Sequence, residues 1–145
     1  MDMKYLIPVL GTVPSLSTMI VDQPENPSDL VIRSYAPYRR FAVQVADDGL
    51  DSLGLTPGDY AIFREQRWPH DECQVCLIAF GNEFTLRILQ GIWNTEPILC
   101  VSGDKIPPIT RHRNDFVILG VLDGVIKSEL AVLQEPEQAD FDWGC

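Results

Sequence analysis

The chain has 145 residues, of which 46% are hydrophobic and 22% are charged, so length and composition predict one globular domain. A domain of this size buries about 70% of its unfolded surface, which excludes a collagen, a disordered tail and a mini-protein that depends on disulfides. The 21 acidic residues outnumber the 11 lysines and arginines, and the net charge of -10 argues against direct DNA binding by this chain.

The sequence also predicts a cytoplasmic protein without a membrane partner. Its apolar runs are far shorter than the roughly 20 residues that cross a bilayer. The N-terminal sequence MDMKY lacks the pattern of a signal peptide. We therefore expect the four cysteines to be reduced thiols.

Cys73 and Cys76 form a Cys-x-x-Cys pair, which raises the question of a metal site. Zinc takes four ligands, and none of the remaining candidates has paired spacing; these are His70, His112, Cys100 and Cys145. We therefore expect no metal and no cofactor.

Short strand signals follow one another along the chain. Apolar runs or period-two alternation predict strands over 5–11, 30–32, 41–46, 60–63, 75–80, 83–89, 98–101 and 116–126. Gly81 and Asn82, between two of these strands, predict a hairpin with a tight turn. Polar, proline-containing segments predict loops over 22–29, 47–58 and 64–72, and only 128–134 has a helical pattern. The whole pattern is typical of a mainly β domain.

The last segment, 128–145, differs in character because it carries acidic residues and neither lysine nor arginine. It reads as a solvated acidic C-terminal tail. Alternatively, Phe141 and Trp143 are anchors that dock, with their acidic neighbours, on a basic surface of a neighbouring chain.

Four stretches carry a family resemblance: IPVLGTV (7–13), VADDGL with GLTPGD (45–50 and 54–59), QVCLIA with EFTLRIL (74–79 and 83–89), and FVILGVLDGVI (116–126). In their order and spacing they resemble the C-terminal domain of LexA-type repressors and UmuD-type mutagenesis proteins, which are self-cleaving Ser/Lys peptidases. The resemblance runs from residue 7 to residue 127. It implies a LexA C-terminal-like (signal-peptidase-like) complex β fold of short, largely antiparallel strands over 1–127, followed by the tail 128–145.

The departures from the family concern the residues that carry its reaction. The resemblance places the family's nucleophilic serine on Gly49, its general-base lysine on Arg87 and its scissile pair near Ser15–Leu16. The reaction needs a hydroxyl to attack and a neutral amine to accept its proton. Glycine has no hydroxyl, and a guanidinium keeps its proton in proteins. We therefore expect a pseudo-peptidase with no catalytic residues.

Two alternatives stay open for these positions. A displaced nucleophile at Ser52 would restore an active self-cleaving peptidase, although no lysine occurs between Lys4 and Lys105. Arg87 shares a strand face with Thr85 and Leu89. We expect Arg87 to form an ion pair with Asp47 or Asp48 in the turn of Gly49, the alternative being an exposed arginine on an edge strand.

The resemblance implies a non-catalytic regulatory and dimerisation domain of a transcriptional repressor or of a protein of the SOS stress response. We expect a homodimer, with the closing strand as dimer edge through Phe116, Ile118, Val121 and Val125. Either a DNA-binding head is missing from this chain, or the chain acts with another regulatory protein. A third hypothesis is a peptide-binding or protein-binding module whose former cleft holds an extended segment, most naturally residues 14–21 of the chain itself.

Overall fold

The computed structural model describes residues 3–21 and 28–135. Over these residues the chain is mainly β, as predicted, with its strands in one mixed and mostly antiparallel sheet. The strands are β1 (Tyr5–Val13), β2 (Met19–Ile20), β3 (Asp29–Ile32), β4 (Arg40–Val45), β5 (Tyr60–Arg64), β6 (Gln74–Phe80), β7 (Glu83–Gln90), β8 (Ile98–Cys100), β9 (Ile109–Thr110), β10 (Val117–Ile126) and β11 (Leu133–Gln134). Two single-turn 3-10 helices are η1 (Asp51–Leu53) and η2 (Ser128–Leu130).

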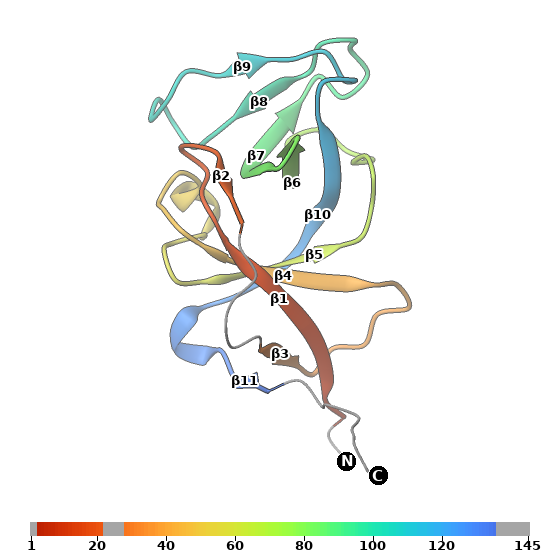
Figure 1. The fold of residues 1–145 in the computed structure, drawn as a ribbon, viewed down its shortest axis with the longest axis vertical. Coiled ribbons are helices and arrows are strands. Elements are labelled where there is room, and N and C mark those ends of the chain that lie inside the picture. Colours follow the sequence, from red (N-terminus) through yellow and green to blue (C-terminus); the bar gives the residue numbers. More distant parts are fainter. Residues whose placement is uncertain (1–2, 22–27, 136–145) are drawn as a thin grey trace.

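The strands follow the order β11-β3-β1-β4-β5-β10-β6-β7-β8-β9, and β2 pairs with β7 (Figure 1). The long strands β1 and β10 connect the end of the molecule that carries β3 and β11 with the end that carries β6 to β9 (Figure 1). Gly120, at a register shift in β10, allows β5 to approach closely. A Cβ atom at this position would lie 2.9 Å from the carbonyl oxygen of Arg64.

The eight predicted strands are present, and so is the hairpin of β6 and β7, in which Gly81 has a positive φ of 63°. The helix expected over 128–134 is wrong. Only η2 is helical; Ala131 is extended, and the Val31 N–H donates to the carbonyl of Val132 over 2.8 Å. Pairing of β11 with β3 thus outweighs the local helical pattern.

The predicted loop 22–29 ends one residue too late, because Asp29 already belongs to β3. Its positions 22–27 lie outside the described residues. Residues 136–145, which include Phe141 and Trp143 of the acidic tail, also lie outside them.

The closing strand is not a sheet edge, which corrects the predicted dimer edge. β10 pairs with β6 through residues 117–121 and with β5 through residues 121–126, so it lies inside the strand order and not at its end. Ile118 and Val121 are buried in a core cluster with Phe116, and Val125 is half-buried against the central core. A continuous apolar run such as FVILGVL is the pattern of a strand covered on both faces.

The central core lies under the turn between β4 and β5. Leu50 and Leu55, on either side of η1, are both fully buried against β4, β5, β6 and β7. This apolar anchoring fixes the position of the turn, which carries Asp47, Asp48 and Gly49. No helix in the described part of the chain is long and apolar enough to cross a membrane.

Candidate functional site

The turn 47–58 is fixed at its far end by the buried carboxylate of Asp59. This carboxylate accepts hydrogen bonds from the Thr56 N–H (2.9 Å), the Thr56 hydroxyl (2.8 Å) and the Ser128 N–H (3.0 Å). It also forms an ion pair with Lys127. Burial by itself raises the pKa of Asp59, but the hydrogen bonds from Lys127, Thr56 and Ser128 outweigh it and hold the pKa well below its usual range.

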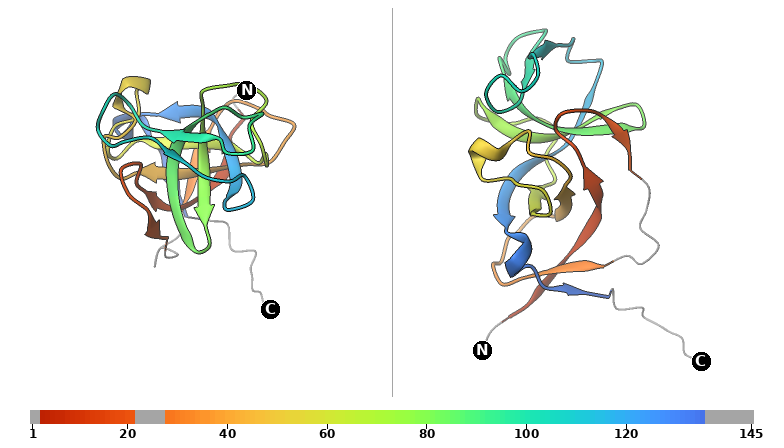
Figure 2. Two further views of the ribbon diagram at one scale, coloured as in Figure 1. Left: turned by 90° about the horizontal axis from the view of Figure 1, so that it is seen from above. Right: turned by 90° about the vertical axis from the view of Figure 1, so that its left-hand side faces the viewer.

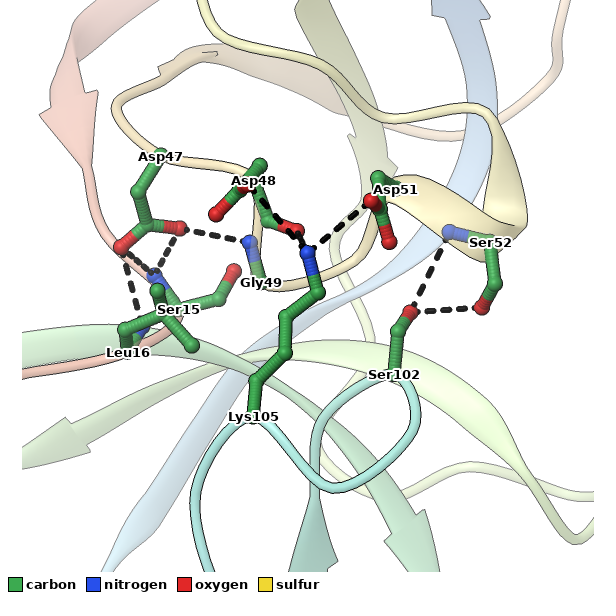
Figure 3. Close-up of polar contacts among 9 residues, drawn as sticks. All are labelled: Ser15, Leu16, Asp47, Asp48, Gly49, Asp51, Ser52, Ser102 and Lys105. Atoms are coloured by element: carbon green, nitrogen blue, oxygen red, sulfur yellow. Dashed lines mark hydrogen bonds and ion pairs between the residues drawn. The ribbon is translucent and has the colours of Figure 1, made fainter.

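At its near end, the turn binds the segment that follows β1. The carboxylate of Asp47 accepts hydrogen bonds from the backbone N–H groups of Ser15 (3.0 Å), Leu16 (2.9 Å) and Gly49 (3.1 Å) (Figure 3). Hydrogen bonds to an ionised acceptor are about twice as strong as neutral ones. Asp47 therefore holds the predicted scissile pair directly against the position of the predicted nucleophile.

The other side of this segment is bound by β7. The carbonyl of Pro14 accepts from the Leu86 N–H (2.9 Å) and from the Thr85 hydroxyl (3.0 Å). Farther along, β2 pairs with the start of β7, Met19 opposite Phe84. We call residues 14–20 the docked segment, because it lies between the turn of Asp47 and strand β7.

Gly49 is buried, and its lack of a side chain is what allows this close contact. A Cβ atom at position 49 would lie 2.6 Å from the Cβ of Ser15 and 3.0 Å from Cδ2 of Leu16. The φ angle of Gly49 is not in the left-handed region. Glycine is therefore required here by close approach and not by backbone conformation. A serine at position 49 has no room while the docked segment stays in place.

Arg87 lies in β7 opposite Cys76 and is only 5% exposed. Its Nε and Nη1 atoms are buried and form no hydrogen bond in the described part of the chain. Burial lowers the pKa of Arg87, and the nearby charge of Asp47 opposes this shift. The guanidinium nonetheless remains charged, as arginine does throughout proteins.

The predicted ion pair of Arg87 is not formed within residues 3–21 and 28–135. The oxygens of Asp47 are taken by three backbone N–H groups, and Asp48 pairs with Lys105 (3.3 Å). The alternative of an exposed arginine on an edge strand is also wrong, because β7 is paired with both β6 and β8 and Arg87 is buried. Arg87 is thus a buried cation. The nearby charge of Asp47 stabilises its charged form although the two side chains form no ion pair within the described residues.

Lys105 is a residue of this region that the sequence did not indicate. Its Nζ lies 2.9 Å from a carboxylate oxygen of Asp51 and 2.9 Å from the carbonyl oxygen of Asp48 (Figure 3). The hydrogen bond to Asp51 raises the pKa of Lys105, and the pKa of Asp51 is lowered in return. Lys105 is therefore an ammonium group and not a proton acceptor.

Ser52, the alternative nucleophile, contacts another hydroxyl rather than an amine. Its Oγ lies 2.6 Å from Oγ of Ser102, which also accepts from the Ser52 N–H (3.3 Å) (Figure 3). Ser102, like Lys105, comes from the loop after β8, for which the sequence offered no motif. Within the described residues, no serine of this site is hydrogen-bonded to a lysine.

The Cys-x-x-Cys pair is divided between two environments. Cys73 is exposed with a positive φ of 60°, whereas Cys76 is fully buried in β6, and burial raises the pKa of its thiol to about 12. Both cysteines and Cys100 are free. Within the described ranges, no three His, Cys, Asp or Glu side chains are placed to hold a metal ion.

Comparison with known proteins adds no assignment: no family model matches the chain, and no curated protein matches its sequence.

Proposed function

We propose that this chain is a catalytically inactive, LexA-like regulatory domain that keeps its own residues 14–20 in the position of the family's substrate segment. The proposal depends on one observation. Ser15–Leu16, Gly49 and Arg87 are far apart in the sequence, and the resemblance gave each a part of one reaction. All three lie around Asp47, which binds the first two directly and whose charge acts on Arg87.

The chemistry of these groups supports an inactive site. No hydroxyl can be placed at position 49 without moving Ser15, because their Cβ atoms would come within 2.6 Å. Arg87 stays charged, and Lys105 is an ammonium group held by two aspartates. Ser/Lys cleavage requires an attacking hydroxyl beside a neutral amine, and the region supplies neither at these positions.

In this role the domain would act through association and not through cleavage. The family resemblance implies regulation of transcription or of the SOS response and formation of a homodimer. The cytoplasmic location is the expectation from the N-terminal sequence and the cysteines. Because Phe116, Ile118 and Val121 of the predicted dimer edge are buried, a dimer would use another surface. Contact with DNA would belong to a separate module, since this chain has a net charge of -10.

The decisive experiment is prolonged incubation of the purified chain at about pH 10.4, where an ordinary lysine amine is half neutral. We expect the intact mass of 16.3 kDa to persist in mass spectrometry. Fragments that separate Ser15 from Leu16 would contradict the proposal.

A quadruple variant tests whether the site still has the geometry that the family's cleavage reaction requires. It combines Gly49→Ser and Arg87→Lys with Ser15→Gly and Leu16→Gly, which removes the Cβ of Ser15 and the side chain of Leu16 that crowd position 49. We expect this variant to cleave itself between positions 15 and 16 at alkaline pH. The matched control lacks only Gly49→Ser and should remain intact.

A receptor for a foreign peptide is the second candidate function. It is favoured by the small size of β2, which covers only two residues of β7. A competing peptide with the sequence of residues 12–21 should bind more tightly to a Leu16→Gly variant than to the original chain, because this change removes a core contact of the docked segment and leaves the peptide and its Asp47 contacts intact. Equal binding by both proteins would exclude exchange at this site.

A further inference from the structure

A groove of about 380 Å³ lies on the outer face of β1, and neither Asp47 nor Gly49 lines it. Pro8 and Leu10 of β1, Phe41 of β4 and Val117 of β10 supply apolar lining. Leu10 is 42% exposed and Val117 is 53% exposed, so this face carries uncovered apolar surface. Uncovered apolar surface with a polar rim is typical of a binding site.

The rim of the groove is basic, although the chain as a whole is acidic. Arg39, Arg40 and Arg67 line it together with a single acidic residue, Glu65. Arg39 and Glu65 are 3.9 Å apart and both are exposed, which makes a weak pair. Arg67 forms no ion pair within the part of the chain that the structure describes. The groove therefore suits an acidic segment with aromatic side chains.

Residues 136–145 of the same chain have this composition. They contain Glu137, Asp140 and Asp142, neither lysine nor arginine, and the two aromatic residues Phe141 and Trp143. The acidic side chains complement the three arginines, and an aromatic ring is the usual anchor in an apolar groove.

The sheet register directs this segment toward the groove. Gln134 of β11 lies opposite Asp29 of β3, which lies opposite Pro8 of β1. Two strand spacings of about 4.8 Å put Gln134 roughly 10 Å from Pro8. Directly paired residues share a face of the sheet, so Gln134 and Pro8 point to the same side.

The chain direction agrees with this placement. β11 is antiparallel to β3, and β3 is antiparallel to β1, so β11 is parallel to β1 in the sheet pairing. β11 lies at the end of the molecule where β1 begins (Figure 2). Residues that continued β11 in the same direction would advance from the level of Pro8 toward Leu10. Ten extended residues span up to about 33 Å, which is ample for the groove.

We propose that residues 136–145 bind in cis to this groove, with Phe141 or Trp143 on the apolar lining and the acidic side chains on Arg39, Arg40 and Arg67. The bound segment covers Leu10 and Val117. This inference does not depend on the inactive peptidase site, because the two surfaces share no residues.

The test uses the full chain with the photo-crosslinking analogue benzoylphenylalanine in place of Phe141. We expect cross-links to peptides that contain Leu10 or Val117, on single chains, with a yield that does not change on tenfold dilution. Cross-links between two chains would assign the groove to a second copy and overturn the proposal. Cross-links to another surface, or none, would also overturn it.

A pair of charge reversals supplies the matched control. Arg67→Glu should lower the cross-link yield about fivefold, the effect of losing a favourable exposed pair, and the loss should be smaller at high salt. Arg111→Glu reverses an exposed arginine outside the groove and should leave the yield unchanged. Equal yields for the two variants would show that the basic rim does not hold the segment.

Discussion

Replacement of Gly49 by alanine is the most direct test of the docked segment. The added Cβ would lie 2.6 Å from the Cβ of Ser15, about 1 Å closer than a normal carbon contact. Ser15 cannot withdraw freely, since its N–H is bound to Asp47 and its side chain is fully buried. Overpacking of this kind costs about 1–3 kcal/mol. We therefore expect Gly49→Ala to lower the free energy of unfolding by this amount.

Urea unfolding followed by circular dichroism measures the loss, provided that the m-value is unchanged. Ser15→Gly removes the atom that is nearest to the new methyl group, so the double variant should recover about 1 kcal/mol relative to additivity. Gly124→Ala is the matched control, because its Cβ would find Ile62 Cδ1 only at 3.9 Å. The reasoning is refuted if Gly49→Ala is as mild as Gly124→Ala, or if its effect simply adds to that of Ser15→Gly.

Three further changes follow from the same contacts. Asp47→Asn removes the charge that binds three N–H groups, so stability should fall by about 2–3 kcal/mol and amide exchange at Ser15 and Leu16 should accelerate. Because the pKa of Asp59 is lowered in the folded chain, the ionised carboxylate contributes its full stabilisation of the fold above about pH 4, and this stabilisation is lost as the pH falls further. The urea midpoint of the original chain should therefore drop below about pH 4, and that of an Asp59→Asn variant should drop less. Arg87→Met replaces a buried cation, whose Nε and Nη1 form no hydrogen bond with the described residues, by an apolar side chain. It should leave stability unchanged or raise it by about 1 kcal/mol in the same assay.

Local pattern predicted most of the sheet because its longer strands carry their own apolar residues. The strands that it missed, β2, β9 and β11, have two residues each and exist only through their partners. The same limit explains the helix expected over 128–134, where pairing with β3 sets the conformation. The position of β10 in the sheet also depends on which strands pair with it. Its apolar run is compatible with an edge strand and with a central strand, so the sequence pattern alone could not distinguish the two.

Sequence reasoning could reach only some of the contacts of the candidate site, for a similar reason. The resemblance named Ser15, Gly49 and Arg87, of which Asp47 binds the first two and influences the third only through its charge. The role of Asp47 was missed because its partners are backbone N–H groups, which no side-chain motif records. Lys105 was missed because its attachment to Asp48 and Asp51 depends on where the loop after β8 passes.

The contact between Ser15 and Gly49 also constrains how this sequence can change over evolutionary time. A larger residue at position 49 is tolerated only after position 15 has become smaller, because the two Cβ positions are 2.6 Å apart. If position 49 changed first, the intermediate protein would have two Cβ atoms in steric conflict and would be less stable. Substitutions at these two sites are therefore expected to be historically ordered, with position 15 acting as the permissive one.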